Sequence, residues 1–453
     1  GALAATLDSL GNDCACPLVR LDAGDATQGS PLQNETKGAA GMALLGALGY
    51  AAVAPGDHDF DWSADALRRR VRQSPYPWLA ANVVDSATGR RPDWLVPWRM
   101  VDVSGIPVAV IGYITPSTKG LMPADRTRGL RFGDGELALH DVLGEVAARR
   151  PLATILLAHA GGVCDAGACT GEIVRLAEEL GRRGVSLIVA GHTHRVMTTS
   201  VAGIPILETG TGGALVGVAD LVKTPSGAQQ FRIGVVAVDS TRMGGDPRFR
   251  AAFDRSRRQR DSIMTRSLAD MKRPLVRSGA QYPLGALLAE ARRNALRTDL
   301  GLVRNESIRA DLPAGPVTYT RLSAVEPARS DLVRLSLTGA QLAALLESIL
   351  AVPDGPSVHL AGAQVRYDPR ATPGSRLRGV VFQGGRRLRA DAEYSVATDE
   401  PTAAAGAGGL TALAGFPAER EGVLDVEAVA ALVRRLPQPV EAAQPAAFVS
   451  TRP

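Results

Sequence analysis

Six side chains that could hold metal ions stand in short turns that follow apolar runs of the chain. They are Asp25, Asp57, His58, His159, His192 and His194. Imidazole and carboxylate groups are ligands for zinc, manganese or iron, and one carboxylate can bridge two such ions. A single histidine in a turn is more often an ordinary residue than a ligand. Six such groups at the ends of strands favour a metal site.

Three apolar runs are expected to position these side chains. Residues 153–158 and 185–190 have the continuous apolar character of strands buried on both faces of a sheet. The first run ends just before His159, and the second just before the turn with His192 and His194. A third run, residues 51–54, precedes the turn 56–61. Because the carboxyl ends of parallel strands lie at one edge of a sheet, the six side chains are expected to meet there.

The other two histidines are predicted to be ordinary residues. His140 falls inside a predicted helix over residues 136–149, and His359 falls in a predicted strand of the second half of the chain.

Strands and helices alternate as far as residue 243, which predicts an α/β domain over residues 1–243 with helices on both faces of a central sheet. Residues 244–273 are charged and helical, as expected of a linker helix between domains. Residues 274–436 form a second α/β segment. The tail, residues 437–453, is rich in proline, alanine and glutamine and is predicted to be disordered.

Local signals predict details of the first domain. Ser63 is expected to cap the helix that follows it, and Thr170 to cap a helix over residues 171–183, because hydroxyl side chains accept hydrogen bonds from the first turn of a helix. Residues 97–103 and 108–113 are expected to pair as a hairpin.

Composition limits the classes of partner. The 453 residues are 45% hydrophobic and 21% charged, and no apolar run is long enough to span a bilayer. The net charge of +5 is scattered, without a basic stripe interleaved with aromatic residues, so nucleic-acid binding is not supported. A mild positive charge suits a small anionic substrate.

The four cysteines form two close pairs, Cys14 with Cys16 and Cys164 with Cys169. No Cys-x-x-Cys is present, which argues against a zinc ribbon. A disulfide is expected between Cys164 and Cys169, which would imply an oxidising compartment; the alternative is two free thiols.

Several stretches resemble the motifs of calcineurin-like metallophosphoesterases, and within them the family of 5'-nucleotidases and UDP-sugar hydrolases. In the first domain these stretches are Asp22–Ser30, Gly56–Trp62, Leu79–Asn82, Ala158–Gly161 and Gly191–His194. In the second domain Asn305–Gly315 is similar to the family's Asn-Gly-Gly-x-Ile-Arg stretch, and Leu337–Glu347 to its Leu-Thr-Gly helix. The resemblance covers nearly the whole chain and implies two domains, a metallophosphoesterase α/β sandwich followed by a 5'-nucleotidase C-terminal α/β domain.

The resemblance implies a role for each matched residue at a centre of two divalent ions, such as zinc or manganese. Asp25 would bridge the two ions. The first ion would be completed by Asp57, His159 and His192, and the second would take His194. A metal-bound water would attack the phosphorus in line.

The resemblance also assigns the groups around the substrate. His58 would lie beside the transferred phosphoryl group as an acid or stabiliser, with Asp61 orienting its ring. Arg309, with Asn305, would grip the substrate from the second domain, and the linker helix would be the hinge of a rotation between domains.

The chain departs from the family pattern at both metals. The Asp-x-His-Gly strand end that supplies two ligands of one ion is not in the sequence, which opens at the helix expected to follow it. We expect that motif to lie before Gly1, along with a signal peptide; the alternative is a crippled site. Asp57 stands where the family has asparagine. The aspartate is still a competent ligand and adds a negative charge.

The second domain departs from the pattern at three more places. Pro327–Ser330 replaces the family's Pro-Phe-x-Asn, Asp399–Pro401 replaces its Asn-aromatic pair, and Ala405–Gly408 replaces its Gly-Gly-Asp-Gly. Two rings that would stack on a nucleobase are therefore missing, and stacking is worth roughly 1–3 kcal/mol per base in nucleic-acid sites.

The leading interpretation is a periplasmic or secreted enzyme that hydrolyses phosphate monoesters, nucleotides above all, with two divalent ions and a His58–Asp61 dyad. Its partner would be a small phosphate ester, with no nucleic acid and no membrane span, and the sequence does not define an oligomeric state. One alternative keeps the metals but changes the substrate to a sugar phosphate, a cyclic nucleotide or a sulfur ester. Another is a non-catalytic relative that binds metal.

Overall fold

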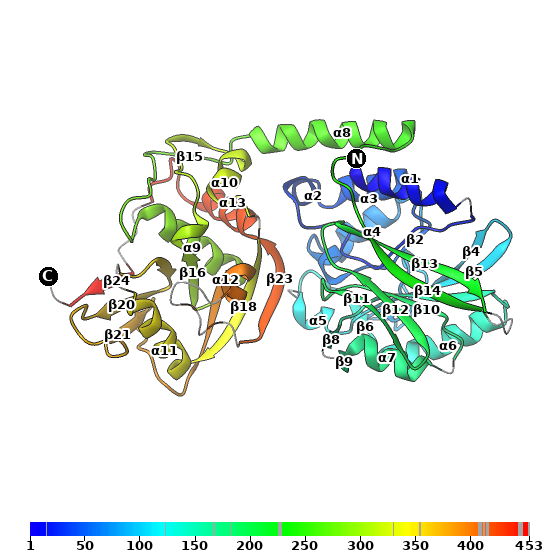
Figure 1. Ribbon diagram of the computed structural model, residues 1–453. Coiled ribbons are helices and arrows are strands. Elements are labelled where there is room, and N and C mark those ends of the chain that lie inside the picture. The colour runs from blue at the N-terminus through cyan, green and yellow to red at the C-terminus, as the bar shows by residue number, and fades with distance from the viewer. Residues whose placement is uncertain are drawn as a thin grey trace. The chain divides into compact units, whose positions relative to one another are not determined.

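The computed structural model describes residues 1–453 except 15, 123, 166–167, 182, 225–228, 329, 353–354, 406–409, 411–412, 414–415, 443–446 and 452–453. The chain divides into two compact units (Figure 1). Unit 1 holds residues 1–28 and 32–259, and unit 2 holds residues 29–31 and 260–453. The division falls inside helix α8 (Pro247–Thr265), within the segment predicted to link the domains. Among the described residues, no helix combines the length and the apolar character that a bilayer crossing requires.

A six-stranded sheet forms the centre of unit 1. Its order is β11 (Val196–Val201), β12 (Ile204–Thr209), β10 (Leu187–Ala190), β7 (Ala153–His159), β5 (Ile106–Ile114) and β4 (Trp98–Val103). The four inner strands are parallel, and the two edge strands are antiparallel to their neighbours. The predicted hairpin is confirmed as β4 and β5.

Alternate residues of the inner strands point to opposite faces of this sheet, and each face has its own core. On one face Ile111, Leu156 and Ile188 pack against helices α6 (Gly135–Ala147) and α7 (Glu172–Leu180). On the other, Val110 and Leu157 pack against residues of β1 (Leu21–Asp22), β2 (Ala52–Val53), β13 (Leu215–Lys223) and β14 (Gln229–Ala237).

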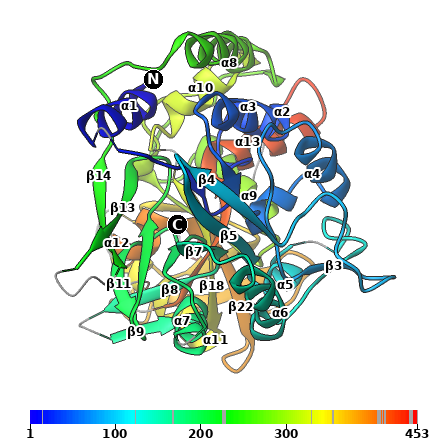
Figure 2. The same cartoon turned by 90° about the vertical axis from the view of Figure 1, so that its right-hand side faces the viewer.

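Helices therefore cover only one face of the six-stranded sheet directly, and the prediction of helices on both faces is wrong in this respect. Val53 points away from the sheet into a further core with α3 (Ala39–Ala47) and α4 (Ala64–Val71). The short strands β1 and β2 lie between these helices and the sheet, as in an α/β sandwich. Figure 2 shows α3 and α4 on one side of β5 and β7, and α6 and α7 on the other.

The remaining elements of the first half are short. They are α1 (Ala2–Cys14), α2 (Pro31–Thr36), the 3₁₀ turn η1 (Asp57–Phe60), β3 (Val83–Asp85), α5 (Thr118–Leu121), β6 (Leu130–Phe132), β8 (Gly162–Asp165) and β9 (Ala168–Gly171).

One predicted helix cap is confirmed and one is wrong. The Ser63 side chain accepts a hydrogen bond from the Ala66 N–H at the start of α4. Thr170 instead lies in β9, and α7 begins after Gly171, whose φ is 116°. A Cβ at Gly171 would stand 2.7 Å from the Gly161 carbonyl oxygen, so glycine makes the close turn possible there.

Both cysteine pairs are disulfides. The predicted bond between Cys164 and Cys169 is confirmed, and it joins residues that face each other across the β8–β9 hairpin. A second disulfide, which the sequence did not predict, joins Cys14 and Cys16.

Unit 2 is built on a five-stranded sheet. Its order is β19 (Val358–Ala361), β16 (Leu300–Arg304), β22 (Glu393–Asp399), β18 (Asp331–Thr338) and β23 (Ala418–Leu424). Helix α11 (Gly339–Leu350) packs on this sheet, and α9 (Pro283–Leu296) packs against β16 and β19. The other elements are β15 (Ala269–Met271), η2 (Asn305–Ser307), β17 (Gly315–Val317), α10 (Tyr319–Val325), α12 (Glu400–Ala405) and α13 (Asp425–Arg435).

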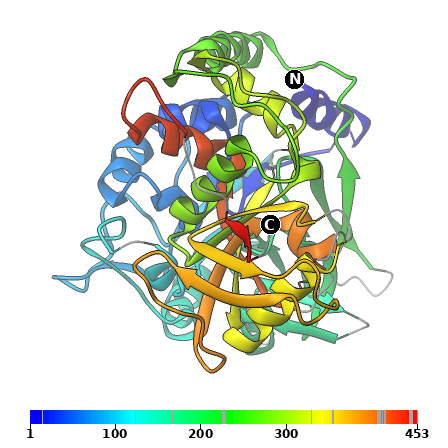
Figure 3. The same ribbon diagram turned by 90° about the vertical axis from the view of Figure 1, so that its left-hand side faces the viewer.

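The tail predicted to be disordered, residues 437–453, is structured where the structure describes it. Strand β24 (Phe448–Ser450) pairs in parallel with β20 (Ala363–Tyr367), whose other neighbour is β21 (Leu377–Phe382) (Figure 3). Val440 and Phe448 are buried, at 1% and 6% exposed. The prediction is wrong because a composition rich in proline and alanine conceals two apolar residues that reach the core.

Candidate metal centre

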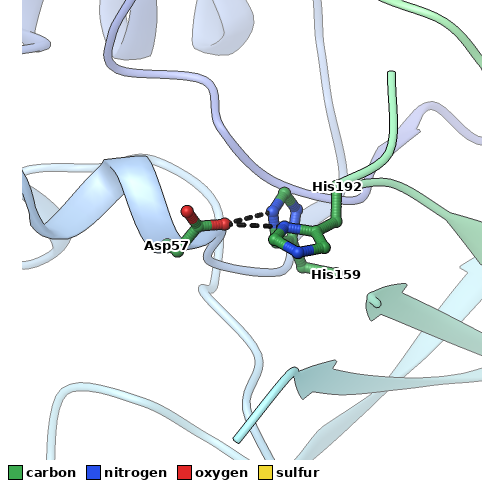
Figure 4. A group of neighbouring side chains, drawn as sticks. All are labelled: Asp57, His159 and His192. Atoms are coloured by element: carbon green, nitrogen blue, oxygen red, sulfur yellow. Dashed lines mark hydrogen bonds and ion pairs between the residues drawn. The ribbon is translucent and has the colours of Figure 1, made fainter. Parts of the chain in front are cut away.

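Two histidines from distant parts of unit 1 contact the carboxylate of Asp57 (Figure 4). Its Oδ1 atom lies 2.9 Å from His159 Nε2 and 2.9 Å from His192 Nδ1. Ligand atoms of the three residues lie within 4.8 Å of one another. Asp57 comes from η1, His159 ends β7, and His192 stands in the turn after β10. These residues could together hold one metal ion.

Asp25 lies beside this group and reaches a further histidine. Its Oδ2 atom is 3.4 Å from His159 Nε2 and 3.9 Å from His194 Nε2. Its Oδ1 atom accepts a hydrogen bond from the His58 backbone N–H at 3.0 Å. The structure thus brings the five predicted ligands into one cluster, with Asp25 between His159 and His194.

His194 has an unpartnered atom that fits a ligand position. Its Nδ1 atom is buried and has no hydrogen-bond partner among the described residues. A buried polar atom without a partner costs free energy, which a bound ion can offset. Both His192 and His194 have left-handed backbones, with φ values of 88° and 55°, a strain often found at functional sites.

The turns that carry these groups pack closely because they contain glycine. A Cβ at Gly56 would stand 2.1 Å from Asp25 Oδ1, and one at Gly24 would stand 2.7 Å from His159 Nδ1. Side chains at either position would push the acidic and imidazole groups apart.

Asp59 joins the two acidic turns. Its carboxylate accepts hydrogen bonds from the backbone N–H groups of Gly56, Asp25 and Thr27, at 2.8, 3.0 and 3.0 Å. Hydrogen bonds to a carboxylate are stronger than neutral ones. These contacts support the structural role expected for Asp59, and they fix Asp25 relative to Asp57.

His58 and Asp61 form the predicted pair. His58 Nδ1 lies 3.3 Å from both carboxylate oxygens of Asp61. The other ring nitrogen, Nε2, lies 3.7 Å from Asp57 Oδ2 and so faces the candidate metal group. Burial lowers the pKa of His58, but the hydrogen bond to Asp61 and the nearby aspartate charges outweigh burial and raise the pKa to about 10.

The aspartate and histidine of the cluster stabilise each other's charged forms. Burial raises the pKa of Asp57, but hydrogen bonds from His159 and His192 outweigh it and hold that pKa well below its usual range. Burial lowers the pKa of His159, while the charge of Asp25 and the hydrogen bond to Asp57 raise it to about 10.

Two contacts near the candidate ligands were not predicted. The Ala23 carbonyl lies 2.8 Å from His159 Nδ1, an arrangement that leaves Nε2 directed at the acidic groups. The Thr193 hydroxyl donates a hydrogen bond to the buried carboxylate of Glu208 in β12. Glu208 is the only charged residue of β12 and follows an apolar run, which was a signal that the sequence offered.

The two predicted substrate residues lie in unit 2. Asn305 begins the η2 turn after β16; its Nδ2 donates to the Ala280 carbonyl at 2.9 Å, and its buried Oδ1 has no hydrogen-bond partner among the described residues. The Arg309 side chain is exposed, and its backbone N–H donates to the Val325 carbonyl.

The remaining histidines lie in the elements predicted for them. His140 lies in α6 with 66% of its side chain exposed, and His359 lies in β19 at 1% exposed. Neither is a member of the candidate metal group.

Comparison with known proteins links both units to one group of enzymes. Residues 265–415 match the family described as "5'-nucleotidase, C-terminal domain". A 5'-nucleotidase of Vibrio vulnificus is 24% identical over 88% of this chain and 79% of its own length. The endonuclease YhcR of Bacillus subtilis is 25% identical over 83% of this chain, which spans only 32% of that longer protein.

Solved structures share the fold. The NAD nucleotidase of Haemophilus influenzae superposes with a TM-score of 0.78 at 17% identity, over 99% of this chain and 92% of that one. A putative 5'-nucleotidase of Staphylococcus aureus gives a TM-score of 0.63 at 18% identity, over 99% of this chain and 94% of that one. These superpositions establish a common fold.

Proposed function

Because residues 265–415 match the C-terminal domain of 5'-nucleotidases and most of the chain is similar to a 5'-nucleotidase, we propose that it hydrolyses phosphate monoesters, with nucleotides as its first candidate substrates. The observation that carries this proposal is the convergence of His159 and His192 on Asp57, with Asp25 beside them. Nitrogen and oxygen donors of this kind suit zinc or manganese.

Two divalent ions complete the proposed centre. Asp57, His159 and His192 hold the first, Asp25 is shared, and His194 belongs to the second. When bound, such ions polarise the phosphoryl oxygens and lower the pKa of a water molecule. For the second ion the printed sequence offers only Asp25 and His194, because it lacks the family's Asp-x-His-Gly stretch.

The chain's own contribution to the reaction comes from His58. Its Nε2 atom points toward the Asp57 carboxylate, while Asp61 accepts a hydrogen bond at Nδ1 and holds the ring. A protonated His58 can donate a hydrogen bond to the phosphoryl oxygens and stabilise the charge that develops on them. Asp61 keeps the ring charged and correctly turned.

Arg309 and Asn305 are the candidate substrate groups of the second domain. A guanidinium binds phosphate or ribose oxygens through two parallel hydrogen bonds, and the exposed Arg309 side chain is available for such a contact.

A second candidate function is the hydrolysis of a different kind of ester at the same metal centre. Asp399, which stands where the family has an asparagine, is 3% exposed and forms an ion pair with Arg292. Its carboxylate is therefore engaged inside the unit. This observation favours an ester without a nucleobase, such as a sugar phosphate, or a sulfur ester.

The two disulfides support a periplasmic or secreted location, since such bonds persist in oxidising compartments. The measurement is a thiol count on the purified protein: two disulfides are expected, and four free thiols would contradict this location.

The decisive experiment measures metal content and turnover together. His58→Ala should reduce hydrolysis of AMP and of other phosphate esters at least a hundredfold and leave metal content unchanged. His140→Ala, a change at an exposed histidine, is the matched control and should alter neither quantity.

One outcome would reject the role proposed for His58, and another would reject the proposed hydrolysis. A loss of metal in His58→Ala would mean that His58 is a ligand. If the wild-type chain, with any residues that precede Gly1 in its gene, binds metal but hydrolyses no phosphate or sulfur ester, the protein is a non-catalytic relative.

A further inference from the structure

A pocket of about 420 Å³ lies in unit 1, away from the metal centre. It is formed by the start of α3, residue Arg70 of α4 and the part of α8 around Ala252. Phe249 of α8 is buried with Leu7 and Leu48, so this part of α8 is anchored to unit 1 by an apolar core. The volume is within the range of small-molecule sites.

Cationic side chains surround this pocket. Lys37, Arg70 and Arg255 line it, against one carboxylate, Glu35. Arg70 donates a hydrogen bond to the Thr36 carbonyl at 3.2 Å, which fixes its position. Neither Lys37 nor Arg255 has an ion pair or a side-chain hydrogen bond within the part of the chain that the structure describes. Two unpaired cations beside a third create a local excess of positive charge.

A hydroxyl without a partner lines the same pocket. Ser256 lines the pocket, is 8% exposed, and has no hydrogen-bond partner among the described residues. Thr36, by contrast, donates its hydroxyl proton to the Leu32 carbonyl at 2.7 Å. The Ser256 hydroxyl lines the pocket and is available to donate a hydrogen bond to a ligand oxygen.

The rest of the lining adds two features that suit an organic anion. The nine-residue helix α3 begins at the pocket, and the N-terminus of a helix carries partial positive charge. Small apolar residues, Ala43 of α3 and Ala252 of α8, also line the pocket. They leave room for an apolar group between the cationic side chains.

We propose that this pocket is a second anion site, which binds a small phosphate ester separately from the metal centre. Lys37, Arg70 and Arg255 contact the phosphate oxygens, the Ser256 hydroxyl donates a hydrogen bond to one of them, and the organic part lies against Ala43 and Ala252. No candidate metal ligand takes part, so the site does not depend on the proposed catalysis.

The test is calorimetric titration of the full chain, treated with EDTA, with inorganic phosphate and with AMP. Arg255→Glu should weaken the binding of both probes at least tenfold. The matched control is Arg258→Glu, which reverses a charge on the exposed side of the same helix outside the pocket and should bind as the wild type does. Equal affinities in the two variants would overturn the proposal.

Two further measurements separate this site from the metal centre and define its ligand. His192→Ala should bind both probes with unchanged affinity, and a loss of binding would assign the anion to the metal centre instead. Tighter binding of AMP than of phosphate, by about tenfold, would support a phosphate ester held against the two alanines. Equal affinity would overturn that part of the proposal.

Discussion

The hydroxyl of Thr193 lies 2.9 and 2.8 Å from the two carboxylate oxygens of Glu208, a side chain that is only 1% exposed. The backbone N–H of Arg195 also donates to this carboxylate. Thr193 and Arg195 flank His194, so one buried acid holds the turn on both sides of a candidate ligand.

Glu208→Ala should therefore weaken metal binding, because the turn loses the group that holds it in its left-handed conformation. We expect roughly a 10–100-fold loss of affinity, the range typical of residues that orient metal ligands. Glu208→Gln keeps an acceptor for both donors and should retain most of the affinity. Titration with Mn²⁺ measures the effect. Glu178→Ala, a change at an exposed acid of α7, is the control, and an equal affinity in Glu208→Ala and this control would refute the positioning role.

Replacing Asp57 tests the centre itself. Asp57→Ala removes the oxygen that lies 2.9 Å from both histidines, so the bound metal should fall by more than half in elemental analysis. Asp57→Asn keeps an oxygen donor but removes a negative charge, and it should retain metal with lower affinity. A full complement of metal in Asp57→Ala would exclude this residue as a ligand.

The stability of unit 2 should decrease as pH falls below 6.5 because of His359. Burial lowers the pKa of this histidine to about 4, and its Nε2 atom has no hydrogen-bond partner among the described residues. Above pH 6.5 the ring is neutral in the folded and unfolded chains. Between pH 6.5 and pH 4 only the unfolded chain binds the proton, so the free energy of unfolding falls with decreasing pH.

The full effect is about 3 kcal/mol, from roughly 1.4 kcal/mol per pH unit over this interval. Urea unfolding at pH 7.0 and pH 5.0 should show about 2 kcal/mol of this effect, because pH 5.0 lies about 1.5 units below the ordinary pKa of histidine. His359→Gln does not titrate and should lose this part of the pH dependence. An unchanged dependence in that variant would assign it to other groups.

A buried arginine should be more important for stability than its neighbour in the same helix. Arg292 of α9 is 1% exposed; it pairs with Glu326 at 2.6 Å and with Asp399. Arg292→Met leaves two buried carboxylates without a cation, which should cost about 3–5 kcal/mol. Arg293→Met breaks the partly exposed pair with Glu290 and should cost about 1 kcal/mol or less. Urea unfolding of the two variants compares these costs, and similar values would contradict the expected difference.

The sequence could predict the parts of the fold that depend on local patterns. The apolar runs of β7 and β10 placed His159 and His192 at neighbouring strand ends. A strand buried on both faces can be recognised from such a continuous apolar run. The Asp57 turn was found for the same reason, since it follows the buried residues of β2.

The parts that the sequence did not predict depend on contacts between distant residues. The layer of strands between the sheet and α3 forms from two-residue strands, too short to show a period. The contact of Thr193 with Glu208 depends on how β10 and β12 pair, and the start of α7 depends on a close approach between Gly171 and Gly161. A pattern along one segment carries no information on such approaches.

Strand β24 has a practical consequence for anyone who prepares this protein. A gene shortened after Leu436, to remove a stretch that is rich in proline and alanine, would delete Phe448 from the core of unit 2 and Val440 from its contact with Met271. It would also turn β20 into an edge strand with unpaired N–H and C=O groups, a common starting point for aggregation. Clones intended for crystallisation should therefore extend at least to Thr451, which donates a hydrogen bond to the Tyr367 carbonyl.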